Sequence, residues 1–89
     1  MATRADIRRK QRLQDLDKML GEHLALLRKQ SGIPQEDVAK ELGFQRPLVS
    51  KIENGHRSLA ACEIPDYARA IGSSTEDIIA FIKDIAAGS

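Results

Sequence analysis

The chain has 89 residues, of which 42% are apolar and 30% charged, which is typical of one folded domain with a modest core rather than of a disordered chain. Aromatic residues make up 3% and Trp is absent, so the core must be built from Leu, Ile, Val and Ala. No apolar run is long enough for a membrane helix, and the first residues show no signal-peptide core. The single cysteine cannot form an internal disulfide, which fits the reducing cytoplasm, so we expect a cytoplasmic protein.

The two parts of the chain differ in charge. Residues 1–58 contain 12 Lys and Arg against 8 Asp and Glu, a charge of +4, whereas residues 59–89 contain 2 against 5, a charge of −3. A basic front and an acidic back favour a molecule that turns one face toward a polyanion.

Residues 3–30 show a helical pattern, with leucines at spacings of three and four. These leucines are Leu13, Leu16, Leu20, Leu24 and Leu27. Gly21 weakens the helix by roughly 1 kcal/mol relative to Ala, so the segment is either one long helix or two joined near Gly21. We expect residues 1–19 to form a basic helical extension, either solvated or in contact with phosphates. Its cations include Arg8, Arg9, Lys10 and Arg12.

Residues 35–54 read as two short helices joined at Gly43, which supplies a position for positive φ. The apolar faces are Val38, Ala39 and Leu42 in the first helix, and Leu48, Val49 and Ile52 in the second. The small side chain of Ala39 suits a steep helix crossing. The outer face of the second helix, 46–53, carries hydrogen-bonding side chains, with Gln45 just before it. This arrangement predicts a helix-turn-helix that places helix 46–53 in a major groove.

Two more helices are expected after Asn54-Gly55. In the first, 61–71, Pro65 requires a start no earlier than about Ala61, or a kink. Its expected buried stripe is Ile64, Tyr67, Ala68 and Ile71. The last helix, 75–86, has more apolar side chains than one buried stripe requires, so we expect a dimer interface there, at Ile79, Ile82 and Ile85. Leu13 and Leu16 of the first helix are the other candidates for this interface.

From about Leu20 to Ile78 the chain resembles the phage-repressor and Cro type of helix-turn-helix regulator, the Xre family. The resemblance is carried by Leu27-Arg28, Gly32-Ile33-Pro34-Gln35, Val38-Ala39, Leu42-Gly43, Val49-Ser50-Lys51-Ile52-Glu53-Asn54-Gly55 and Ala68-Arg69-Ala70-Ile71-Gly72. It implies an all-α, five-helix lambda-repressor-like domain over residues 20–89, here with an extended N-terminal helix. It also implies a transcriptional repressor that reads a palindromic operator in double-stranded DNA as a homodimer.

The resemblance further implies the role of each site residue. Base contacts fall to Arg46, Pro47, Ser50 and Lys51, and phosphate contacts to Gln35, Gln45, Asn54, His56 and Arg57. Arg28 and Glu53 are expected to form an ion pair. Two residues depart from the family pattern: Gln45 replaces the usual Ser or Thr N-cap, which weakens the cap, and Pro47 cannot donate a hydrogen bond but can contact a thymine methyl.

The sequence shows no catalytic constellation, so we expect no enzyme, cofactor, metal or small-molecule ligand. His23, His56 and Cys62 fall on separate elements without metal-ligand spacing. We expect His23 to be exposed and Cys62 to be a small residue of the core or its boundary. The alternative function is a helix-turn-helix module that binds another protein, such as the antitoxin of a toxin–antitoxin pair. Specific DNA binding, unlike that alternative, weakens steeply with salt.

Overall fold

The computed structural model describes residues 2–88, and its regular elements in this range are all helical. In chain order these are α1 (Arg4–Gln30), α2 (Gln35–Leu42), α3 (Arg46–Glu53), the short 3-10 helix η1 (Ala61–Glu63), α4 (Ile64–Ala70) and α5 (Thr75–Ala87). The five α-helices confirm the predicted all-α class. None of the helices within the described range has the length and apolarity that a membrane span needs.

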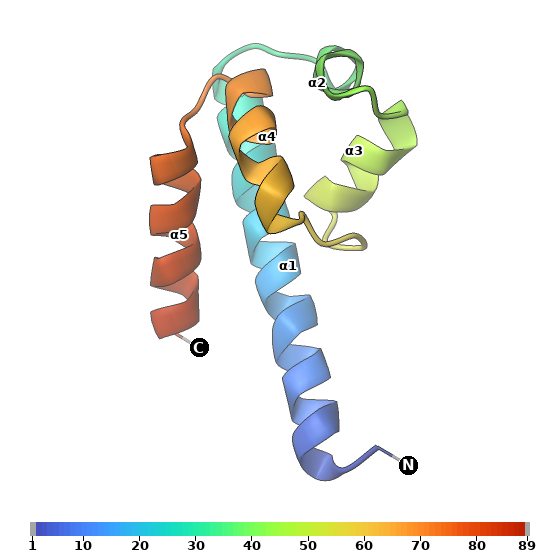
Figure 1. Cartoon of the computed structure of the whole chain (residues 1–89), viewed down its shortest axis with the longest axis vertical. Helices are drawn as coiled ribbons and strands as arrows, with labels where there is room; N and C mark the ends of the chain where they lie inside the picture. Colours follow the sequence, from blue (N-terminus) through green and yellow to red (C-terminus); the bar gives the residue numbers. More distant parts are fainter. Residues whose placement is uncertain (1, 89) are drawn as a thin grey trace.

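Helix α1 is one continuous helix of 27 residues, not two joined near Gly21. At about 1.5 Å per residue it is roughly 40 Å long, close to the 42 Å longest dimension of the molecule. Figure 1 shows its N-terminal part projecting beyond the other helices, and residues 4–15 are all exposed. Thr3 caps the helix by accepting a hydrogen bond from the Asp6 backbone N–H, at 3.1 Å.

At Gly21 the backbone of α3 lies very close to α1. A Cβ atom at this position would lie 2.6 Å from the carbonyl oxygen of Glu53, and it would overlap the carbonyl oxygen of Ile52 as well. The absence of a side chain therefore lets the C-terminal end of α3 rest directly on α1. The glycine that weakens the helix locally is the residue that permits the tertiary contact.

The core lies between the second half of α1 and the four shorter helices. It comprises Leu20, Leu24, Val38, Ala39, Val49, Ile52, Ile64, Tyr67, Ala68, Ile71, Ile78 and Ile85. This list contains the complete stripe predicted for α4. The leucine stripe of α1 is buried only from Leu20 onward, because Leu13 lies beyond the packed region and is 51% exposed. Leu16 and Leu27 pack at the edge of the core.

Helix α4 corresponds to the predicted helix 61–71 but starts three residues after Ala61, the earliest start that Pro65 was expected to allow. Residues 61–63 form a 3-10 turn, and the α-helix starts at Ile64 with Pro65 in its first turn, where proline needs no hydrogen-bonded N–H. Helix α5 begins as predicted after Ser74, whose hydroxyl accepts a hydrogen bond from the Asp77 backbone N–H at 3.2 Å.

Two side chains lie in surroundings that differ from the prediction. His23 is half-buried rather than exposed, and its ring stacks on that of Phe81 with 3.8 Å between centroids. Cys62 is exposed in the 3-10 turn, outside the core, because η1 runs over the surface before α4 enters the core.

Candidate nucleic-acid interface

The helix-turn-helix is formed by α2 and α3. Figure 1 shows α2 end-on while α3 runs across the view, so the two axes cross steeply. Gly43, at φ 68°, ends α2 in the left-handed conformation, and the Phe44 N–H reaches back to the Ala39 carbonyl at 2.8 Å. Ala39 itself is buried, as expected of the small side chain at the crossing.

Helix α3 has one buried and one open face. Val49 and Ile52 are buried in the core, whereas Arg46, Pro47 and Lys51 are exposed and Ser50 is half-buried. Residues four apart lie above one another on a helix, so the four form two adjacent rows, Arg46 with Ser50 and Pro47 with Lys51. The structure thus brings the four predicted base-contact residues onto one surface.

The N-terminus of α3 has the weak cap that its sequence predicts. Gln45 occupies the N-cap position, but its side chain makes no capping hydrogen bond and is exposed. Pro47 lies in the first turn, where its missing N–H breaks no helical hydrogen bond. Arg46 faces Glu36 of α2 at 3.6 Å, and both side chains are largely exposed. An exposed ion pair of this kind contributes little to stability.

Arg28 and Glu53 form the predicted ion pair, and it is buried. Arg28 Nε donates to Glu53 Oε2 at 2.6 Å and Nη2 donates to Oε1 at 3.1 Å, a bidentate arrangement. The residues are only 8% and 7% exposed. The hydrogen bonds to Glu53 raise the pKa of Arg28 despite burial. The pair joins α1 to the C-terminal end of α3.

Gln35 is the first residue of α2 and is half-buried. Its side-chain amide donates to Glu53 Oε1 at 2.9 Å, so it adjoins the buried ion pair. Residue spacing could not predict this bond, because Gln35 and Glu53 are 18 residues apart. The N–H groups of Gln35 and Glu36 come before the first hydrogen bond of the helix, which the Asp37 N–H donates to the Pro34 carbonyl at 3.1 Å.

Arg57, a predicted phosphate contact, is half-buried and pairs with groups of its own chain. It donates to both carboxylate oxygens of Glu63, at 3.1 and 3.0 Å, and to the Ser58 carbonyl at 3.3 Å. Its guanidinium also lies over the ring of Phe44, 5.4 Å from the centroid. The hydrogen bonds raise the pKa of Arg57 and lower that of Glu63. Arg57 therefore fastens the loop after α3 to the turn between α2 and α3.

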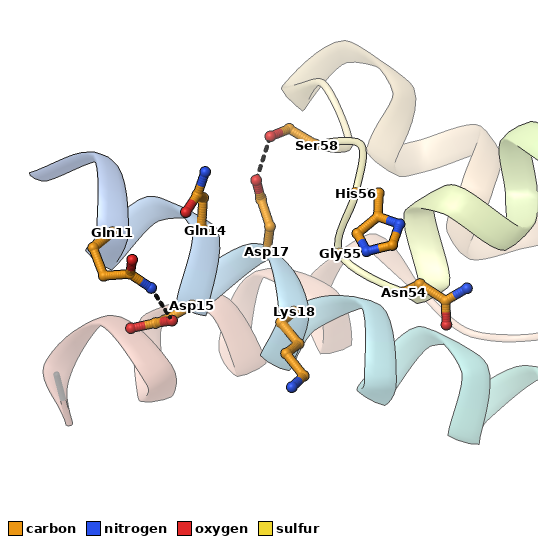
Figure 2. A pocket seen from close by; sticks show the side chains of 9 residues that line it. All are labelled: Gln11, Gln14, Asp15, Asp17, Lys18, Asn54, Gly55, His56 and Ser58. Carbon is orange, nitrogen blue, oxygen red and sulfur yellow. Dashed lines mark hydrogen bonds between the residues drawn. The ribbon is translucent and has the colours of Figure 1, made fainter. Parts of the chain in front are cut away.

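A polar cleft of about 580 Å³ separates the N-terminal part of α1 from the loop after α3. Figure 2 shows this loop lying along α1, with Ser58 directed toward Asp17. The Ser58 hydroxyl donates to Asp17 at 2.5 Å, and Gln11 donates to Asp15 at 3.0 Å along α1. The Ser58–Asp17 bond and the Arg57 contacts hold the loop that carries Asn54 and His56, both exposed.

The predicted dimer residues on α5 are unequally available. Ile85 is 8% exposed and belongs to the core of the single chain, whereas Ile79 and Ile82 are half-buried at its edge. Leu13 is exposed and Leu16 half-buried on the neighbouring α1. Within residues 2–88, no group of three His, Cys, Asp or Glu side chains is placed to hold a metal ion.

The chain matches known proteins over most of its length. A family model described as a helix-turn-helix domain matches residues 19–80. The chain is 31% identical to an uncharacterized HTH-type transcriptional regulator, y4dJ of Sinorhizobium fredii, over 65 residues that cover 73% of this chain and 84% of that protein. The solved structure of an XRE-family like protein from Pseudomonas syringae is 27% identical, with a TM-score of 0.70 over 94% of this chain and 98% of that one.

These matches confirm the predicted lambda-repressor-like fold and the predicted family, which is one of transcriptional regulators and not of enzymes. The chain belongs to the helix-turn-helix DNA-binding transcriptional regulators of the Xre family.

Proposed function

We propose that the protein is a repressor that binds a palindromic operator as a homodimer and reads it with α3. The observation that carries this proposal is the division of α3 into a buried face and an open, polar face. The same exposed rows supply two cations, a hydroxyl and an apolar ring, which are the groups that contact base edges in a major groove. Bound at a promoter in the cytoplasm, such a dimer would block transcription.

Each residue in the two rows on α3 has a proposed contact. Arg46 and Lys51 donate to guanine O6 and N7, Ser50 hydrogen-bonds a base or a phosphate, and Pro47 packs on a thymine methyl. Arg46 must leave Glu36 to reach DNA, and because that pair is exposed its loss costs little. The Glu36 carboxylate also lies beside the proposed DNA surface and opposes binding.

Phosphate contacts are proposed for Gln35 and Gln45, at the starts of α2 and α3, and for Asn54 and His56 after α3. All four have side chains that can donate, and Gln45, Asn54 and His56 are exposed. Arg57 is proposed as a phosphate contact too, because Glu63 and Ser58 engage three of its five guanidinium N–H groups and leave two of them to donate. These contacts fix the orientation of the protein on DNA, whereas the α3 side chains select the sequence.

A dimer is supported by the small number of bases that one short helix can read. Two copies related by a two-fold axis place two recognition helices about one DNA turn apart, which doubles the length of sequence read. The half-buried Ile79 and Ile82, together with Leu13 and Leu16 of α1, are proposed to meet their symmetry mates.

Selection of bound duplexes from a random DNA pool tests this function. The expected product is a palindrome with half-sites roughly 10–10.5 base pairs apart, centre to centre. Its affinity should fall with salt at a log–log slope of about −0.9 per phosphate neutralised by a cation. A pool without enrichment would favour the antitoxin-like, protein-binding alternative. A reporter gene placed downstream of the selected sequence distinguishes a repressor from an activator. Co-expression of the protein should lower the expression of the reporter.

A further inference from the structure

Gln35 is the proposed phosphate contact that is itself held by a buried group. Its Nε2 donates to Glu53 Oε1 at 2.9 Å, and Glu53 is 7% exposed. A carboxylate can only accept hydrogen bonds, so the nitrogen of the Gln35 amide, and not its oxygen, must face Glu53. The amide cannot flip without losing this bond. One of its two N–H hydrogens is used by Glu53, and the other remains to donate.

Glu53 is in turn fixed by Arg28. The two bidentate bonds, at 2.6 and 3.1 Å, bind its carboxylate to a guanidinium that is also buried. Arg28 has one more contact, because its Nη1 donates to the Ile33 carbonyl at 2.9 Å, two residues before α2 begins. The start of α2 is therefore held at two points, at Ile33 by Arg28 and at Gln35 by Glu53.

We propose that Glu53 is a positioning residue for the DNA backbone contact of Gln35. This proposal rests on the proposed function and adds a second role to the ion pair. By fixing the amide and the first turn of α2 before DNA arrives, Glu53 spares Gln35 the rotamer entropy that an exposed glutamine loses on binding. Arg28 contributes through Glu53 and through Ile33.

The test needs a variant that removes the anchor and keeps the fold. Replacing both members of a buried ion pair by apolar residues of similar size is often neutral or stabilising, whereas removing one is not. The double variant Arg28→Met, Glu53→Leu meets this requirement, and circular dichroism with thermal unfolding checks it. If it does not fold, Arg28→Leu with Glu53→Met provides a second apolar pair.

Gln35→Ala is then measured in both backgrounds, using as probe a duplex enriched from a random pool by the wild-type protein. In the wild-type background we expect the affinity to fall about tenfold or more, as for a hydrogen bond to a charged group. In the background without the ion pair we expect Gln35→Ala to change the affinity less than about twofold, because the amide is no longer positioned.

Ethylation interference supplies a readout that a purely structural role would not move. In the wild type, ethylating the phosphate contacted by Gln35 should prevent binding. That single interference should disappear both in Gln35→Ala and in Arg28→Met, Glu53→Leu, while the interference at other phosphates remains. A role limited to stability would lower the folded fraction and weaken all contacts alike.

Gln45→Ala is the matched control, since Gln45 opens the other helix of the motif and has no hydrogen bond to Glu53 in the described part of the chain. It should cost the same factor in both backgrounds. An equal cost of Gln35→Ala in both backgrounds would overturn the positioning role while leaving the proposed function intact. A wild-type protein that enriches no duplex would overturn both.

Discussion

At the scale of single residues, the buried Arg28–Glu53 pair has the largest expected effect on stability. Two charges taken out of water are tolerated because each satisfies the other through two hydrogen bonds. Removing one leaves the other buried without its partner. The net worth of the intact pair is nevertheless small, since a well-packed apolar pair can replace it.

We therefore expect Glu53→Ala to lower the free energy of unfolding by about 3–5 kcal/mol. Arg28→Met combined with Glu53→Leu should lie within about 1 kcal/mol of the wild type, because no charge is left stranded. Urea unfolding followed by circular dichroism measures both. A loss of about 0.5 kcal/mol or less for Glu53→Ala, the usual range of surface substitutions, would contradict the burial of this charge.

Glu63 makes stability depend on pH. Its hydrogen bonds from Arg57 and from the Ala60 backbone N–H hold its pKa below the ordinary value of 4.5. A carboxyl whose pKa is lower in the folded state stabilises the protein above its unfolded pKa, and this contribution is lost as pH falls through the folded pKa. The loss therefore begins below about pH 5.

The variant Glu63→Gln should be less stable than the wild type by about 1 kcal/mol at pH 7, and the difference should shrink as pH falls below 4. Arg57→Leu should likewise reduce the dependence of stability on pH below about pH 5, because it removes the main cause of the lowered pKa of Glu63. Thermal unfolding from pH 7 to pH 3 provides the comparison. A wild type and a Glu63→Gln variant with parallel curves over this range would rule out the linkage.

At the scale of elements, the hydrophobic pattern predicted the helices, whereas tertiary contacts decided several side-chain roles. The stripe of α4 is buried as its spacing predicts. Residue spacing could not show that Gln35 reaches Glu53 or that Arg57 pairs with Glu63, since these bonds depend on how the chain turns after α1 and α3. His23 is half-buried because α5 returns along α1 and places Phe81 on it.

At Gly21, helix propensity and tertiary packing predict opposite effects of a substitution on stability. Helix propensity predicts that Gly21→Ala stabilises α1 by about 1 kcal/mol. The backbone of α3 lies where the new methyl would go, and it cannot move aside as a side chain could. Overpacking of this kind costs about 1–3 kcal/mol, so the two elements must separate at a net loss.

We expect Gly21→Ala to destabilise the protein by about 1–2 kcal/mol, with the opposite sign to helix propensity. Glu22→Ala, at the exposed neighbouring position, is the control and should change stability by no more than about 0.5 kcal/mol. Chemical unfolding of the two variants gives their free energies of unfolding, and the sign of the change in Gly21→Ala shows whether helix propensity or packing dominates. A more stable Gly21→Ala protein would mean that the α1–α3 contact is looser than the structure shows.

At the scale of the whole molecule, packing within one chain limits the apolar surface of α5 that is available for a dimer interface. Ile85 is already in the core, so Ile79 and Ile82 are the large apolar side chains left at the proposed interface on α5, and both are half-buried. A stable interface buries on the order of 800 Å² on each partner. Two partly covered isoleucines fall well short of this area, so a dimer through α5 needs α1 as well.

Leu13 and Leu16 are the proposed source of the missing surface, because Leu13 continues the leucine stripe of α1 past the core, Leu16 lies at the edge of the core, and α1 contacts α5. We therefore expect Leu13→Glu and Ile79→Glu each to raise the dimer dissociation constant at least tenfold in sedimentation equilibrium, since each buries a charge in the interface. Leu26→Glu is the control: Leu26 is 49% exposed on α1 but lies roughly 140° around the helix from Leu13. If Ile79→Glu alone dissociates the dimer, α1 takes no part. If neither does, the two-fold axis lies on another face.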